Sequence, residues 1–260
     1  MSLLRATCEI DFSSVVDVPV ILMLRPRSGV AQWVFREEYS IEPRLAVIEH
    51  TDIFGNLCQR AVIQSGETRL RAACTVDVAP SVDIDDGAAF VSPGDLPEFA
   101  LPFLLPSRYC PSDQLNPLAQ EIVARLVPGY KQVEAIRKWL YRTIEYRYGH
   151  STQATTAADT ARDRIGVCRD FAHLGIALCR ALNIPARMVV GYIEKTRVPD
   201  VHAWFEAYLG SRWFTFDGTH ERTLGNRIAI AYGRDATDVA FVTHFGPLTL
   251  TRLEVTVTAQ

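Results

Sequence analysis

The feature that most constrains the fold is a proline-rich segment, "SPGDLPEFALPFLLPSRYCPSD", at residues 92–113. It contains Pro93, Pro97, Pro102, Pro106 and Pro111. Prolines at this density prevent long helices and strands. Because the hydrophobic period differs on its two sides, we predict a linker here. The prediction is an N-terminal domain at residues 1–110, which carries the linker at its end, and a second domain at residues 111–260.

The residues before this segment have the pattern of β-structure. "CTVDVAP", residues 74–80, alternates apolar and polar side chains with a period of two, as a half-buried strand does. Residues 32–43 and 45–66 hold further β-branched and aromatic runs, and Gly55-Asn56 is a plausible hairpin turn between two of them. Several short strands without a helical period predict a β-sandwich-like domain.

The residues after the segment have a helical period. One helix is expected at 116–129, where Pro117 suits the first turn and Pro128-Gly129 stops it. A second helix is expected at 130–149, and a third begins near Cys168. Strands are then expected at residues 186–194, 201–209, 212–219 and 250–259. This order predicts an α+β fold with helices packed on an antiparallel sheet.

Composition excludes several classes of protein. The 260-residue chain has a formal net charge of -3, so it lacks the broad basic field that nucleic-acid binding requires. Its most apolar early segment, residues 15–26, is short and contains Asp17 and Pro19, and the first residues do not resemble a signal peptide. The six cysteines form no C-x-x-C pair, which indicates free thiols rather than disulfides or structural zinc. We therefore expect a cytoplasmic protein without nucleic-acid or membrane partners.

Two cysteines of the third expected helix lie in different environments. Cys168 follows Gly166 and Val167 at the start of the helix, whereas Cys179 lies deep in its apolar pattern. Backbone N–H groups in the first helical turn lack intrahelical partners and favour negative charge, so a thiol there ionises more readily. Cys168 is thus a candidate nucleophile, although a small buried residue at the start of a core helix would look the same. Cys179 is interpreted as a packing residue.

A nucleophilic thiol needs a base, and the base needs a group that orients it. His202 opens one expected strand and Asp217 ends the next. With a tight turn around Leu209-Gly210, these two residues oppose each other, and a longer turn shifts the register by a residue or two. We expect Asp217 to hold the Nδ1–H of His202 while Nε2 points toward the Cys168 thiolate. The alternative is a hydrogen bond at the strand ends with no chemistry.

The other five histidines are weaker candidates. His173 is expected to make a core or interface hydrogen bond, and His220 lies close enough to Asp217 to border the site. The remaining three have no obvious partners, namely His50, His150 and His244. No H-E-x-x-H or similar spacing appears, so we expect neither a metal nor a cofactor.

Three blocks resemble the transglutaminase-like superfamily of papain-like cysteine enzymes. They are "RIGVCRDFAHLGIALCRALNIPARMVVGYI" (164–193), "DVHAWFEAYL" (200–209) and "RWFTFDGTH" (212–220). The N-terminal "DIFGN" and the C-terminal "YGRDATDVAFV" resemble a bacterial subgroup that carries a β domain before the catalytic domain. One departure is the glycine after Asp217, where the family commonly has proline. The resemblance implies a papain-like, transglutaminase-like catalytic core.

The resemblance also implies acyl transfer by a Cys168–His202–Asp217 triad on peptide or protein amides. Cys168 would attack the carbonyl, His202 would move the proton, and Asp217 would fix the His202 tautomer. The Cys168 backbone N–H would hold the oxyanion with a second donor, for which Tyr146 and Trp204 are candidates. No calcium-loop pattern is present. We favour hydrolysis, as a protease or amidase; the alternatives are protein-glutamine transglutaminase activity and a non-catalytic binding module.

Overall fold

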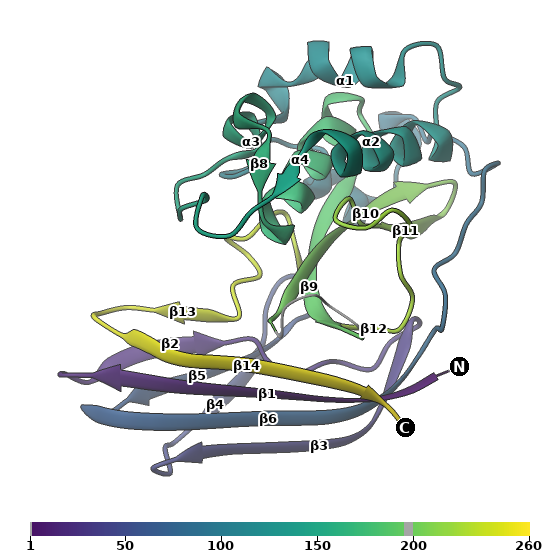
Figure 1. Ribbon diagram of the computed structural model, residues 1–260. Helices are drawn as coiled ribbons and strands as arrows, with labels where there is room; N and C mark the ends of the chain where they lie inside the picture. The colour runs from purple at the N-terminus through teal and green to yellow at the C-terminus, as the bar shows by residue number, and fades with distance from the viewer. Residues whose placement is uncertain (1, 195–199) are drawn as a thin grey trace.

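The computed structural model describes residues 2–194 and 200–260 and has an α+β architecture, as predicted (Figure 1). Six strands come first: β1 (Ser2–Ser14), β2 (Val18–Leu22), β3 (Gln32–Glu42), β4 (Ile48–Thr51), β5 (Leu57–Ile63) and β6 (Gly66–Val78). The middle of the chain holds α1 (Asn116–Val123), α2 (Tyr130–Thr143), β7 (Glu145–Tyr146), α3 (Ala157–Asp163), β8 (Ile165–Gly166) and α4 (Cys168–Ala181). The last strands are β9 (Ala186–Ile193), β10 (His202–Leu209), β11 (Arg212–Phe216), β12 (Arg227–Gly233), β13 (Val242–His244) and β14 (Thr249–Ala259). No helix in these described ranges is long and apolar enough to cross a bilayer.

The N-terminal strands form two four-stranded sheets, in the orders β14-β1-β6-β3 and β13-β2-β5-β4. Alternate residues of β1 are buried, from Leu4 to Phe12, because one face of the sheet packs into the core. The C-terminal strand β14 lies antiparallel to β1 across most of its length (Figure 1). The chain thus leaves these sheets after β6 and returns to them as β13 and β14, and the boundary at residue 110 stays a prediction.

A third four-stranded sheet, β11-β10-β9-β12, carries α4 on one face. The helix α4 and the strand β10 are in close contact because Gly175 of α4 has no side chain. A Cβ there would lie 2.5 Å from the ring of Phe205 on β10. The proline-rich segment forms three short 3-10 helices at residues 93–95, 98–103 and 112–114. Residues 96–103 pack on the opposite face of the sheet, whereas residues 112–114 contact α4. Phe103 packs edge-on against Trp213, with ring centroids 5.4 Å apart. The segment is therefore a packed layer as well as a connection.

Two side-chain amides join β12 to the N-terminal sheets. Gln32 accepts from the N–H of Ala229 and donates to its carbonyl, both at 2.8 Å, and Asn56 does the same for Tyr232. Asp52 orients Asn56 by accepting from its backbone and side-chain N–H groups, which explains the "DIFGN" pattern. These amides satisfy backbone groups on the outer edge of β12 that a further strand would otherwise satisfy.

Two predicted helices end earlier than expected. The first ends at Val123 because Ala124 adopts a positive φ of 44°, and Leu126 is exposed rather than on a buried helical face. The second ends at Thr143 because Glu145 and Tyr146 pair in parallel with Ile165 and Gly166. The hairpin around Gly55-Asn56 is present, but residues 52–56 connect its strands rather than a two-residue turn.

Candidate active site

Cys168 is the first residue of α4, as predicted, and its side chain is partly accessible. The start of the helix is fixed by Asp170, whose carboxylate accepts from the Val167 N–H at 2.9 Å and from the Ser151 hydroxyl. Arg169 donates to the Thr152 carbonyl at 2.8 Å and so holds the preceding loop against the same turn. The thiol therefore projects from a rigid helix N-terminus.

Cys179 contrasts with Cys168 on the same helix. It is completely buried, and this burial raises the pKa of its thiol well above the ordinary value. The interpretation of Cys179 as a packing residue is confirmed.

His202 and Asp217 are brought together by the β10–β11 hairpin. The turn is Gly210-Ser211, because Leu209 pairs with Arg212 and Tyr208 with Trp213. The turn is as tight as predicted but lies one residue further along the chain, so the register is two residues away from the prediction and the two residues do not pair directly. They still lie at the same end of the hairpin, as expected. His202 Nε2 lies 2.8 Å from Asp217 Oδ2, and the two residues are only 7% and 1% exposed.

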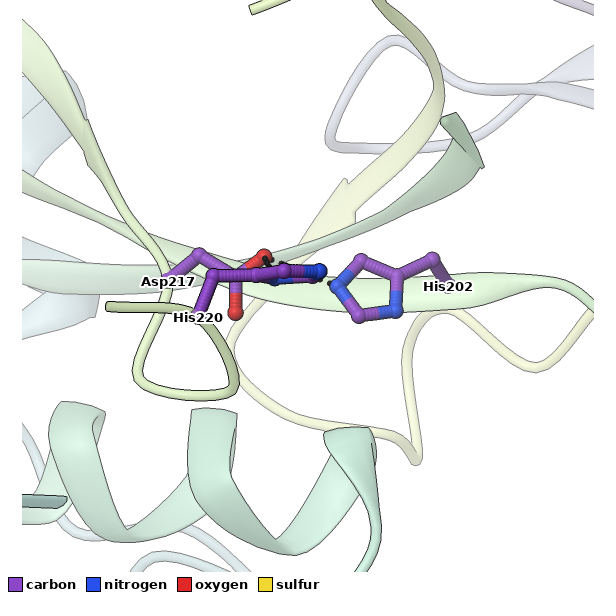
Figure 2. Close-up of side chains that lie close together, drawn as sticks. All are labelled: His202, Asp217 and His220. Carbon is purple, nitrogen blue, oxygen red and sulfur yellow. Dashed lines mark hydrogen bonds and ion pairs between the residues drawn. The ribbon is translucent and has the colours of Figure 1, made fainter. Parts of the chain in front are cut away.

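The ring nitrogen that contacts Asp217 differs from the prediction. The carboxylate binds Nε2, not Nδ1, so the expected assignment of the two nitrogens is wrong. Figure 2 shows His202 with one ring nitrogen toward Asp217 and the other turned away from it. The Cys168 thiol lies close enough to the same imidazole to favour its protonated form. Because Nε2 is engaged, Nδ1 is the nitrogen left for the thiol.

The charges around His202 favour its protonated form. Burial alone would lower the pKa of His202, but the charge and hydrogen bond of Asp217, with a smaller contribution from Cys168, raise it to about 9. Burial would likewise raise the pKa of Asp217, yet His202 and Arg227 hold it well below the usual range of a carboxyl. The pair is therefore suited to hold an imidazolium next to the thiol.

Asp217 has more partners than the sequence suggested. Arg227 Nη2 lies 2.8 Å from Oδ2, and His220 Nδ1 lies 3.3 Å from the same oxygen. The other oxygen, Oδ1, accepts from the backbone N–H and the hydroxyl of Thr219. His220 thus borders the site, as expected. Arg227 was missed, because a single arginine at the start of a strand carries no spacing signal.

His202, Asp217 and His220 each offer a ligand atom, all within 4.8 Å of one another (Figure 2). Such a grouping can hold a metal ion by spacing alone. Arg227 is permanently charged and bonds the same carboxylate oxygen, so it repels a cation at this point. We therefore interpret the grouping as an ion-paired network, and the expected absence of a metal site stays a prediction.

The two candidate oxyanion donors occupy different positions. Tyr146 lies near Cys168, because the β7–β8 pairing places it opposite Gly166, and its hydroxyl donates to the Tyr148 hydroxyl at 3.3 Å. Trp204 is buried, and its ring lies near His202, with centroids 6.3 Å apart and planes 24° from parallel. Only Tyr146 is thus placed at the thiol-bearing turn.

The remaining histidines lie away from this cluster. His173 is buried and its Nε2 accepts from the Ala236 N–H at 3.1 Å, so the predicted core hydrogen bond is confirmed; burial lowers the pKa of His173 to about 4. Two of the three histidines without expected partners do have one: His150 lies 3.7 Å from Asp163, and His244 lies 2.7 Å from the Gly246 carbonyl.

Two family models match the chain. Residues 116–218 match the transglutaminase-like superfamily, and residues 10–79 match the bacterial transglutaminase-like N-terminal region. A crystal structure from Cytophaga hutchinsonii, described as a "Putative Cysteine Protease", is 35% identical over 99% of this chain and 90% of its own, with a TM-score of 0.93. An uncharacterized protein of Mycobacterium leprae is 26% identical over 84% of this chain and 82% of its own length.

Proposed function

Because this chain belongs to the transglutaminase-like superfamily, we propose that it is a cysteine-dependent acyl-transfer enzyme acting on amide bonds of peptides or proteins. Cys168, His202 and Asp217 are its proposed triad. The observation that carries the proposal is the buried pair of His202 and Asp217, 2.8 Å apart, with the Cys168 thiol near enough to the imidazole to favour its protonation. The family resemblance found in the three sequence blocks is confirmed.

In the proposed reaction, the Cys168 sulfur attacks the amide carbonyl carbon while His202 holds the thiol proton at Nδ1. The tetrahedral intermediate collapses as His202 gives this proton to the leaving amine, which leaves a thioacyl-enzyme. Asp217 stabilises the imidazolium and fixes the ring through Nε2. Water then attacks the thioester, His202 takes its proton, and the carboxylic acid and free thiol are released.

The oxyanion of this intermediate needs two donors. The backbone N–H of Cys168 is one, and the closeness of Tyr146 to Cys168 supports Tyr146 as the second, with its hydroxyl turning from Tyr148 to the oxyanion. Trp204 is the weaker candidate because its ring lies along His202, on the side of the base. Hydrolysis is favoured over transfer to an amine, and the description of the Cytophaga hutchinsonii relative as a "Putative Cysteine Protease" supports that choice. The six free thiols support the cytoplasm as the proposed location.

The test is alkylation by iodoacetamide at pH 7, read for each cysteine by mass spectrometry. Cys168 should react and Cys179 should stay protected. His202→Ala should slow alkylation of Cys168 by about 10²-fold, since a positioned base contributes 10²–10⁴. Equal rates in the two proteins would mean that the proposed ion pair does not exist.

Peptide amides are then tested with and without a primary amine, with Cys168→Ala as the inactive control. Release of the free acid in both conditions supports hydrolysis. Incorporation of the amine would identify a transglutaminase instead. Absence of both reactions in a protein whose Cys168 is also inert would favour the non-catalytic binding module.

A further inference from the structure

The Asp217 carboxylate is shared between His202 and a permanent cation. Arg227 Nη2 and His202 Nε2 both lie 2.8 Å from Oδ2. The two nitrogens are therefore within about 6 Å of each other, the range in which like charges shift a titration by a unit or more. Asp217 thus stabilises the imidazolium of His202, while the positive charge of Arg227 beside it opposes protonation of that imidazole.

Arg227 is held in place from several sides. Its side chain is 7% exposed, its Nε donates to the Leu224 carbonyl at 2.6 Å, and its guanidinium lies over the Trp204 ring at 4.9 Å from the centroid. These contacts leave the guanidinium little freedom to leave the carboxylate.

The backbone before Arg227 is anchored to the N-terminal sheets. The Asn226 N–H donates to the Ala79 carbonyl at 3.1 Å, just after β6. Gly225 approaches Pro80 so closely that a Cβ would lie 2.0 Å from the Pro80 carbonyl oxygen. The position of Arg227 at the start of β12 is thus set by the N-terminal region as well as by the sheet.

A general acid must release its proton as readily as it accepts it. A buried carboxylate paired with His202 alone would hold the imidazolium proton tightly and slow its transfer to a leaving amine. A second cation on the same oxygen weakens that hold while keeping the carboxylate in its orientation.

We propose that Arg227 is a positioning residue that divides the charge of Asp217 and so keeps the His202 proton transferable to the leaving group. The proposal rests on the proposed acyl-transfer function. Among residues 2–194 and 200–260, the other charged or titratable groups around His202 are Cys168 on α4, Asp200 before β10, and Asp217 and His220 after β11.

The first measurement is an NMR titration of the ¹⁵N-labelled histidines, with the His202 signal assigned from His202→Gln. Arg227→Gln should move the His202 midpoint upward by about 1 pH unit, because a neighbouring positive charge is lost. In Arg227→Lys, the His202 midpoint should stay close to its wild-type value. Arg187→Gln is the matched control, since Arg187 is also ion-paired, to Glu206 at 2.6 Å, and lies over an aromatic ring, that of Trp213.

The second measurement compares a peptide amide with the corresponding activated ester, whose leaving group needs no proton. Arg227→Gln should reduce amide turnover roughly tenfold more than ester turnover. Arg187→Gln should leave their ratio unchanged.

If Arg227 has only a structural role, the His202 midpoint shifts in the opposite direction. If Arg227 only supports the loop, its loss displaces Asp217, the His202 midpoint falls, and amide and ester turnover fall together. A midpoint that falls or stays in place, or an unchanged amide-to-ester ratio, overturns the proposal. If the wild type turns over neither substrate, the proposed function fails, and the NMR titration still decides whether Arg227 opposes protonation of His202.

Discussion

Two of the ion-pair networks in the molecule lie in opposite environments. The first surrounds Asp217, where three nitrogens meet one carboxylate oxygen in a nearly inaccessible site. The second lies on the exposed face of the β14-β1-β6-β3 sheet and is here called the outer-face network. It joins Arg252 to Glu9 (3.1 Å), Glu9 to Arg71 (3.6 Å), Arg71 to Glu38 (3.3 Å) and Glu38 to Arg5 (3.6 Å).

The difference between the two networks shows that burial, and not the number of ion pairs, determines how strongly a network affects stability and protonation. Side chains of the outer-face network are about one third exposed or more, so water and salt screen their charges. The charges around Asp217 have left water, so each depends on its neighbours for solvation. Only the buried network can therefore alter the protonation of a reacting group strongly.

The largest effect is expected when the buried carboxylate is removed. Asp217→Asn leaves Arg227 and the imidazolium without their anion, which costs about 3–5 kcal/mol of unfolding free energy. It should also reduce turnover by roughly 10⁴-fold, the loss seen when the orienting carboxylate of a triad is replaced by an amide. Urea denaturation and peptide-amide kinetics measure the two effects.

The matched change in the outer-face network is Glu9→Gln, which removes one carboxylate of the same kind from an exposed position. If both variants lose the same stability, burial does not distinguish the two networks.

An intermediate effect is expected from pH. The raised pKa of His202 contributes stability that is fully present below about pH 6.5, its unfolded value, and is lost as the pH rises through about 9. Asp217 has a lowered pKa, so its contribution is present above about pH 4 and is lost as the pH falls further. The urea midpoint of the wild type should therefore fall between pH 6 and pH 10.

The control for this pH dependence is His202→Gln, whose midpoint should change less over the same interval. A wild-type midpoint that is constant from pH 6 to pH 10 would contradict the assigned ion pair. The same urea midpoints are then measured against pH for Arg227→Gln. The proposed division of charge requires its loss of stability to occur at higher pH than in the wild type.

The smallest effect is expected in the outer-face network. Glu9→Gln should change the unfolding free energy by less than about 1 kcal/mol, because exposed pairs contribute little. The change should shrink further in 1 M NaCl, where the Debye length is about 3 Å. The turnover of peptide amides by Glu9→Gln should equal that of the wild type. A larger loss that survives high salt would mean that the exposed network acts as a cooperative unit.

The sequence predicted the parts of the site that depend on local patterns. The start of α4 at Cys168 followed from the helical period, and the closeness of His202 and Asp217 followed from hairpin geometry. Tyr146 could not be placed in the same way, because a two-residue parallel pairing with β8 has no hydrophobic period. The choice between the two nitrogens of His202 depends on a ring rotation that the backbone register does not determine.

The parts that depend on long-range contacts were not predicted. The position of Arg227 depends on Leu224, Trp204 and the end of β6, and no local pattern connects these residues. The last strand was predicted from its own residues, but its pairing with β1 spans nearly the whole chain. A period of two predicts that a strand exists and not which strand it joins.

The pairing of β1 with β14 has a consequence for how the protein is made. Ribosomes synthesise the chain from its N-terminus, so β1 exists long before β14, which pairs with it from Leu4↔Ala259 to Ser13↔Thr249. Until then, one edge of β1 presents unpaired backbone groups beside a strongly apolar strand face, and such an edge is a template for association with other chains. The intervening residues must compact before closure of so long a loop becomes favourable. We therefore expect the vulnerable stage of biosynthesis to last until the final eleven-residue strand has docked.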